Sequence, residues 1–304
     1  MSLFGETSRE FSASKSFLEL MLTAKPIKES VMSQIRGERA NLIIPDEIGG
    51  GGQESDKFAP VAPLHIYHSM AMNGYVPKTI LLLAHEVVKD PRGWSDLFVE
   101  SNVFSDTTII MDNSVAELGE AVDMEMVYDA AASVGADYVV LPDVYGKGKA
   151  TGEAIKSVWP KWQRKFDGIK NIAVLHGSSV EDWFDCVEIV KQFPIDMISI
   201  PRKLQLDLIG GENRLTYVRW ASAIFPNVPI HLLGFSDEPW HDMEAAAHRS
   251  VVSIDSAVPL RVDYSRSNYG IQAFKRPEGW WDNVEFERWM IDSCKAIDNL
   301  INKL

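Results

Sequence analysis

The chain of 304 residues has little cysteine and no pair of cysteines in a C-x-x-C arrangement. This excludes a cysteine-rich structural zinc site. The two cysteines, Cys186 and Cys294, lie far apart in helix-like stretches. We expect both to be buried free thiols rather than a disulfide.

The sequence also lacks long apolar runs. None reaches the roughly 18–20 residues that a membrane-spanning helix needs. The first ten residues, M-S-L-F-G-E-T-S-R-E, have no basic region followed by an apolar one, as a secretory signal would. We therefore expect an intracellular, cytoplasmic protein without membrane contacts.

The sequence has fewer basic than acidic residues, 30 against 43, and a net charge of -13. Such a surface argues against non-specific nucleic-acid binding over the whole molecule, because phosphates are bound by Lys and Arg. Two segments are locally basic, and each is either a solvated face or part of a groove. The first contains Lys147, Lys149, Lys156, Lys161, Arg164, Lys165 and Lys170, and the second contains Arg261, Arg266, Lys275 and Arg276.

Short runs of Val, Ile and Leu alternate with helix-period segments from about residue 78 onward. Such runs are typical of parallel strands buried on both faces. Counting N-L-I-I-P near Asn41, there are eight candidate strands, and a helix over Val284 to Leu304 follows. The alternation predicts an α/β fold, a (β/α)8 TIM barrel forming one domain over residues 1–304. Residues 1–60 would be an irregular extension, and residues 78–304 would carry the main repeats.

No G-x-G-x-x-G follows the first predicted strand, so nothing favours a dinucleotide-binding fold. The predicted strands instead end in polar residues. In a barrel, the active site lies at the carboxyl ends of the strands. We therefore predict a functional cluster there, made of His85, Glu86, Asp112, Asn113, Asp143, His176, Gly177, Arg202, Gly234 and Asp255.

Three kinds of chemistry suit such a cluster. Metal-assisted hydrolysis could use His85, His176, Asp112 and Asp255, although the H-x-H pair common in such barrels is absent. Phosphate binding near the last two strands usually needs more glycine than L-L-G-F-S-D offers. Substitution at a sugar anomeric carbon needs one carboxylate to attack and a second to transfer protons, which Asp255 and Asp112 could do.

Five motifs in order resemble the tRNA-guanine transglycosylase superfamily. H-L-L-G-F-S-D-E-P-W and then S-I-D-S-A-V-P-L-R are similar to the family's last barrel segment, and T-I-I-M-D-N-S-V-A-E-L is similar to its L-T-D-S-G-G-Y-Q segment. V-L-P-D-V-Y resembles F-D-E-C, and A-V-L-H-G-S-S-V-E-D-W resembles I-Q-Q-G-S-x-x-x-x-L-R. I-S-I-P-R-K-L stands where the family has a glycine pair. The resemblance covers roughly residues 108–270.

The resemblance implies a role for each matching residue. Asp255 falls on the family's nucleophile, with Arg261 after it, and Asp112 falls on the general acid/base. Asp143 falls on the aspartate that reads the Watson–Crick edge of the purine. His176 stands where the family has a glutamine and would donate a hydrogen bond to the base, next to Gly177 and Gly234. No cofactor is implied.

The family's C-x-C-x-x-C…H zinc site is missing from this sequence. In lacking this site, the sequence most resembles the phage and bacterial relatives that exchange guanine in DNA for a queuosine-like 7-deazaguanine. The resemblance thus implies a phage-type DNA-modifying enzyme, with DNA and a free base such as 7-cyano-7-deazaguanine as partners. Lys147, Lys149, Arg202 and Arg266 would contact the nucleic acid.

Four alternatives stay open: a tRNA enzyme without zinc, an N-glycosylase, a metal-dependent barrel hydrolase and a binding protein with a degenerate site. The oligomeric state is also open, with a homodimer among the states allowed.

Overall fold

The computed structural model describes residues 56–162, 168–202, 214–235, 239–265 and 279–304, with the side chains of 239–241 left aside. The chain divides into two units, residues 1–52 and 53–304, and all described residues lie in the second. No helix among them is long and apolar enough to cross a membrane. Both cysteines are buried and free, as predicted.

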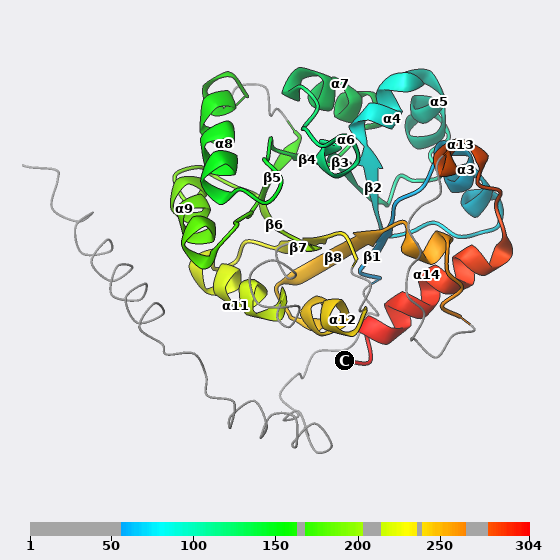
Figure 1. The fold of residues 1–304 in the computed structure, drawn as a ribbon. Helices are drawn as coiled ribbons and strands as arrows, with labels where there is room; N and C mark the ends of the chain where they lie inside the picture. The colour runs from blue at the N-terminus through cyan, green and yellow to red at the C-terminus, as the bar shows by residue number, and fades with distance from the viewer. Residues whose placement is uncertain (1–55, 163–167, 203–213, 236–238, 266–278) are drawn as a thin grey trace, which may run out of the picture. The chain divides into compact units, whose positions relative to one another are not determined.

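Eight parallel strands form a nearly closed (β/α)8 barrel, which confirms the predicted fold class (Figure 1). Their order around the sheet is β1-β8-β7-β6-β5-β4-β3-β2. The strands are β1 (Phe58–Pro60), β2 (Thr79–Leu83), β3 (Thr108–Asp112), β4 (Tyr138–Val140), β5 (Lys170–Val174), β6 (Met197–Pro201), β7 (Ile230–Leu233) and β8 (Val251–Ser256).

Helices cover the outside of the sheet, which is why the strands are apolar on both faces. The longer ones are α3 (Leu64–Met72), α7 (Met124–Val134), α8 (Gly148–Trp162), α9 (Val180–Val190), α11 (Arg214–Ile224), α12 (Pro239–Ala247) and α14 (Arg288–Ile301). Shorter ones are α4 (Ala84–Lys89), α5 (Pro91–Ser95), the π-helix η1 (Asp96–Glu100), α6 (Val115–Leu118), the 3₁₀-helix η2 (Val258–Leu260) and α13 (Trp280–Asn283).

The first strand differs from the prediction. The barrel begins at Phe58, inside the predicted extension and well before residue 78, whereas N-L-I-I-P lies outside the described residues. β1 pairs with β8 and has no ladder with β2, although both strands are described. The buried Tyr67 hydroxyl spans this seam: it donates to the Pro60 carbonyl at 2.6 Å and lies 3.3 Å from the Leu81 carbonyl oxygen.

Apolar side chains from most strands fill the barrel interior. They form a cluster of Val61, Leu81, Leu83, Ile110, Val140, Ile172, Val174, Met197 and Ala257. Barrel interiors are packed in layers in this way and are not pores. Because the strands are parallel, their carboxyl ends all open at one end of the barrel, where the predicted cluster lies.

Candidate active site

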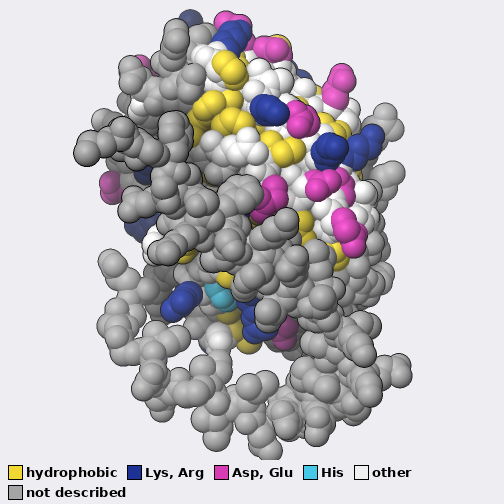
Figure 2. Space-filling view, turned by 90° about the vertical axis from the view of Figure 1, so that its left-hand side faces the viewer, with side chains coloured by type: hydrophobic (Ala, Val, Ile, Leu, Met, Phe, Trp, Pro, Cys, Tyr) yellow, Lys and Arg dark blue, Asp and Glu magenta, His cyan; other side chains and the backbone are white. Residues whose placement is uncertain are grey.

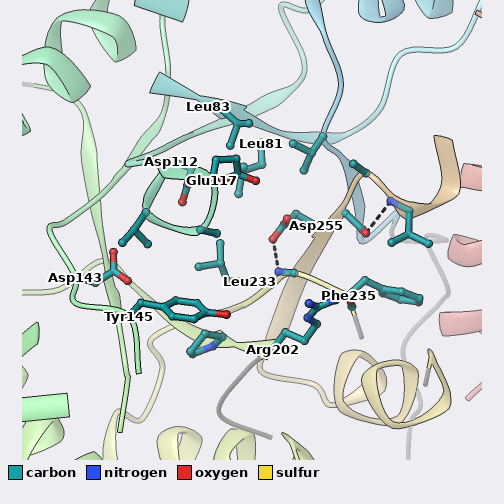
Figure 3. Close-up of a pocket in the computed structure, with 18 of the residues that line it drawn as sticks. Leu81, Leu83, Asp112, Glu117, Asp143, Tyr145, Arg202, Leu233, Phe235 and Asp255 are labelled. Atoms are coloured by element: carbon teal, nitrogen blue, oxygen red, sulfur yellow. Dashed lines mark hydrogen bonds between the residues drawn. The ribbon is translucent and has the colours of Figure 1, made fainter. Parts of the chain in front are cut away.

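One cavity of about 490 Å³ lies at the carboxyl ends of the strands (Figure 3). Asp112 ends β3, and Asp255 is the next-to-last residue of β8. Figure 3 shows both carboxylates at this cavity, with Glu117 beside Asp112. The predicted residues that line it are Asp112, Asp143, His176, Arg202, Gly234, Asp255 and Arg261.

Asp255 is held through one of its two carboxylate oxygens. Oδ1 accepts a hydrogen bond from the Gly234 amide at 2.8 Å and lies 3.1 Å from Nε2 of His231. Gly234 adopts φ +78°, a left-handed conformation that favours glycine. No described residue donates a hydrogen bond to Oδ2. The second oxygen therefore remains available to a ligand in the cavity.

A buried arginine fixes the strand ends beside Asp255. Arg214, at the start of α11, is fully buried and paired with the equally buried Asp242 at 2.7 Å. It also donates to the carbonyls of Gly234, Leu233 and Ile200 at 2.6–2.8 Å. These bonds tie α11 and α12 to the ends of β6 and β7. Nothing in the sequence distinguishes this arginine from the exposed ones around it.

Asp112 is in a different environment. Its side chain is buried to about the same degree as that of Asp255, with exposed fractions of 5% and 7%, and its Oδ2 accepts a hydrogen bond from the Ser114 amide at 2.7 Å. Ser114 adopts φ +65°, unusual for a residue other than glycine. Burial, together with the nearby charges of Glu117 and Asp143, raises the pKa of Asp112 well above its ordinary value. The arrangement favours a protonated Asp112 that can give up its proton to a ligand.

Asp143 belongs to a chain of buried polar side chains. Oδ1 accepts from Nδ2 of Asn113 at 2.6 Å, and Oδ2 lies 2.5 Å from Nε2 of His176. Nδ1 of His176 accepts a hydrogen bond from the Gly146 amide at 3.2 Å. The ring proton of a neutral His176 is therefore on Nε2 and points to Asp143.

These hydrogen bonds change two expectations: that His176 donates to the base, and that Asp143 is open to the base. Both ring nitrogens of His176 are engaged, so His176 has no N–H left for a purine oxygen; its contact is with Asp143. The Asp143 side chain has no exposed surface. It keeps one further lone pair on each oxygen, but a base reaches them only after a neighbouring side chain moves. Tyr145 lies beside this pair: it is 41% exposed, and its ring lies edge-on to His176.

Gly177, predicted to contact a substrate, does not line the cavity. A side chain at this position would lie 2.7 Å from the backbone nitrogen and Cβ of Trp183. The need for glycine here is explained by the close approach of α9.

Asp182 ties the loop after β4 to the loop after β5. Its carboxylate accepts hydrogen bonds from the amides of Gly148, Lys149 and Ser178 at 2.8–2.9 Å and from the Ser178 hydroxyl at 3.0 Å. Partial burial opposes its ionisation, but these hydrogen bonds outweigh that effect and lower the pKa of Asp182 to about 2. The two loops carry Asp143 and His176, so Asp182 helps to keep that pair together.

The predicted basic residues fall into different places. Lys147 and Lys149 are exposed where α8 begins, at the end of the barrel that carries the cavity. Arg202 and Arg261 line the cavity, and Arg202 donates to the Phe235 carbonyl at 2.8 Å. Arg266, with Lys275 and Arg276, lies outside the described residues.

Arg164 and Lys165 of the first basic segment lie outside the described residues, and its described residues do not form one continuous groove. Lys156 pairs with Glu153 at 3.8 Å, and Lys161 pairs with Glu125 at 3.0 Å. Lys170 begins β5, at the end of the barrel opposite the cavity. Figure 2, seen from the side of α8 and α9, shows basic and acidic side chains interspersed on the described surface.

Three aromatic residues, Trp94, Tyr145 and Phe235, belong to the segments that follow the strands, where a side chain could stack on a base. Tyr145 and Phe235 line the cavity, although Phe235 is buried and packs edge-on to Tyr264. Trp94 is buried and stacks on Phe98, away from the cavity, so its role is core packing. Tyr145 alone of the three is substantially exposed.

A metal site would need several His, Cys, Asp or Glu side chains close together. Within the described ranges, no group of three His, Cys, Asp or Glu side chains is arranged to hold a metal ion. His85, one of the ligands considered, is paired with Glu86 at 3.0 Å.

The fold and the cavity together define a (β/α)8 barrel with carboxylates at its mouth. A scan against protein-family models and a search of curated proteins each found no match for the chain.

Proposed function

We propose that the protein exchanges guanine in DNA for a 7-deazaguanine through a covalent aspartyl–sugar intermediate. One observation carries the proposal: two carboxylates at the same cavity are held in opposite ways. Both are buried, but Oδ1 of Asp255 is held by the Gly234 amide and by Nε2 of His231, and its Oδ2 receives no hydrogen bond from a described residue. Asp112 instead has a pKa raised by burial and by the nearby charges of Glu117 and Asp143. When two carboxylates take part in one reaction, their different environments make one the nucleophile and the other the proton donor.

The first step is attack on the sugar. The target guanine leaves the base stack, because C1′ is enclosed in a duplex. Oδ2 of Asp255 then bonds to C1′ as the C1′–N9 bond breaks and its electron pair moves to the base. Asp112 gives its proton to the departing purine. The incoming base reverses these steps: Asp112 takes up its proton, the base nitrogen bonds to C1′, and Asp255 is released.

The cavity suits a purine-sized ligand. Its volume of about 490 Å³ lies within the range of roughly 300–1,000 Å³ that is typical of small-molecule sites. Asp143 would accept hydrogen bonds from guanine N1–H and N2–H through its remaining lone pairs, once the side chains that cover it move aside. Tyr145 would then be placed to stack on the base.

The nucleic-acid contacts would be local. Lys147 and Lys149 are exposed beside the cavity, and Arg202 and Arg261 lie in its wall. A few cations at the mouth can bind phosphates even though the protein is acidic as a whole.

The proposal is tested by incubating the protein with duplex DNA and 7-cyano-7-deazaguanine, digesting the DNA and measuring its nucleosides by mass spectrometry. We expect 7-cyano-7-deaza-2′-deoxyguanosine from the DNA and no modified nucleoside from a parallel tRNA reaction. Asp255→Ala should abolish exchange, and Asp112→Asn should slow it by about 10²-fold or more, the scale of general acid–base catalysis.

Three outcomes would contradict the proposal. Modified tRNA with unmodified DNA would identify the tRNA activity. Loss of guanine without replacement would identify an N-glycosylase. Full exchange activity in Asp255→Ala would remove Asp255 from the nucleophile's role.

A further inference from the structure

A polar layer lies inside the barrel directly beneath Asp255. Ser199 on β6 is opposite His231 on β7, which is opposite Ser253 on β8. All three are buried, with exposed fractions of 0%, 0% and 2%. An imidazole in such a place costs free energy unless its nitrogens have partners.

Both nitrogens of His231 do have partners. Nδ1 lies 2.8 Å from the Ser253 hydroxyl, and Nε2 lies 3.1 Å from Oδ1 of Asp255. The same Oδ1 accepts the Gly234 amide at 2.8 Å. An ionised carboxylate only accepts hydrogen bonds, so the proton of this contact is on Nε2. The Ser253 hydroxyl can then donate to Nδ1.

We propose that His231 is a positioning residue for Asp255: a neutral imidazole, with its proton on Nε2, that fixes Oδ1 and leaves Oδ2 to react. The proposal rests on the function proposed above. Two donors on one oxygen, from β7 and from the turn after it, restrict rotation of the carboxylate. The oxygen that attacks C1′ is thereby aimed at the cavity before the substrate arrives.

The neutral state of His231 suits both stages of the reaction. When Oδ2 bonds to C1′, the carboxylate becomes an ester, and its negative charge leaves with the electron pair of the broken C1′–N9 bond. Oδ1 becomes the ester carbonyl oxygen and can still accept both N–H groups. A neutral donor serves the carboxylate and the ester alike, whereas an imidazolium would be left as a buried charge without a counter-ion.

The chain offers a series of matched variants for the test. His231→Gln keeps an amide N–H near the position of Nε2. His231→Leu removes the donor and fills the same space with an apolar side chain. Ser199→Ala is the control, because its hydroxyl is buried in the same layer and has no hydrogen-bond partner among the described residues. Each variant is assayed for DNA base exchange, with kcat and KM for DNA determined separately.

We expect His231→Leu to lower kcat by about 10²-fold with little change in KM, as for the loss of one preorganised donor. His231→Gln should recover most of that loss, and Ser199→Ala should match the wild type. A wild-type kcat in His231→Leu would overturn the proposal. So would an equal loss in His231→Gln, because it would mean that the imidazole itself transfers a proton.

A second measurement does not depend on catalysis. In protein labelled with ¹⁵N-histidine, the His231 signals are identified by their loss in His231→Gln. We expect a neutral ring with the proton on Nε2 at pH 7.5, and a changed Nε2 shift in Asp255→Asn. A proton on Nδ1, or an imidazolium, would overturn the proposal. A wild-type protein that shows this ring but exchanges no base would instead contradict the proposed function alone.

Discussion

At the scale of single residues, Asp112 and Asp255 differ in what surrounds their oxygens. Burial and neighbouring charge favour protonated Asp112, whereas Asp255 is fixed by two N–H donors. The raised pKa of Asp112 means that the folded state binds a proton more tightly than the unfolded chain does. The stability that comes from this tighter proton binding is fully present below the pKa of Asp112 in the unfolded chain. It is lost as the pH rises through the pKa of Asp112 in the folded protein.

We therefore predict that Asp112→Asn stabilises the protein at high pH. An asparagine can still accept the Ser114 amide but never carries a buried charge. The gain in unfolding free energy should grow from near zero at pH 4 to the order of 1 kcal/mol at pH 8. Urea unfolding across this range measures it, with the exposed Asp185→Asn as the control. A gain that is independent of pH would contradict the assigned state of Asp112.

Sequence reasoning found some of the residues at the cavity and missed others. Asp112, Asp143 and Asp255 were identifiable because each follows or ends an apolar run, and parallel strands open at one end. His231 and Arg214 were not, because their importance comes from buried contacts with residues distant in the chain. His176 was placed correctly in the cavity wall, but its partner could not be read from the sequence.

At the scale of elements, α8 divides the predicted basic segment. Lys147 directly precedes α8 and Lys149 lies in its first turn, so both are at the mouth. Lys161 lies near the other end of the helix, toward the end of the barrel where Lys170 begins β5. A helix of 15 residues is about 22 Å long, so the basic residues spread along α8 cannot all line one short groove at the mouth. Spacing in the sequence alone did not reveal this.

We predict that Lys147→Glu with Lys149→Glu weakens DNA binding and reduces the slope of log K against log salt by about 2, one for each lost phosphate contact. Lys78→Glu with Lys170→Glu is the control, since both residues are exposed and lie at the opposite end of the barrel. Fluorescence anisotropy at several salt concentrations measures both pairs. An equal loss in the control pair would show that net charge, and not position, governs binding.

At the scale of the whole molecule, the rhythm of apolar runs predicted the barrel. Seven of the eight predicted strands are confirmed, from Thr79–Leu83 to Val251–Ser256. The eighth prediction, N-L-I-I-P, lies outside the described residues. The strand Phe58–Pro60 was not predicted, because it is only three residues long and ends in proline, so it gives no periodic signal. Its place is set by pairing with β8 and by the hydrogen bond that the Phe58 amide donates to the buried Asp298 on α14 at 2.7 Å.

The most direct test of the central claim is to trap the covalent intermediate. The protein is incubated with guanine-containing DNA without an incoming base, denatured, treated with nuclease and trypsin, and analysed by mass spectrometry. Trypsin releases Ser250–Arg261, whose only side-chain carboxylate is that of Asp255. The account predicts a deoxyribose-phosphate adduct on this peptide, absent from Asp255→Ala. The absence of any adduct in a protein that exchanges base, or an adduct on another peptide, would contradict it.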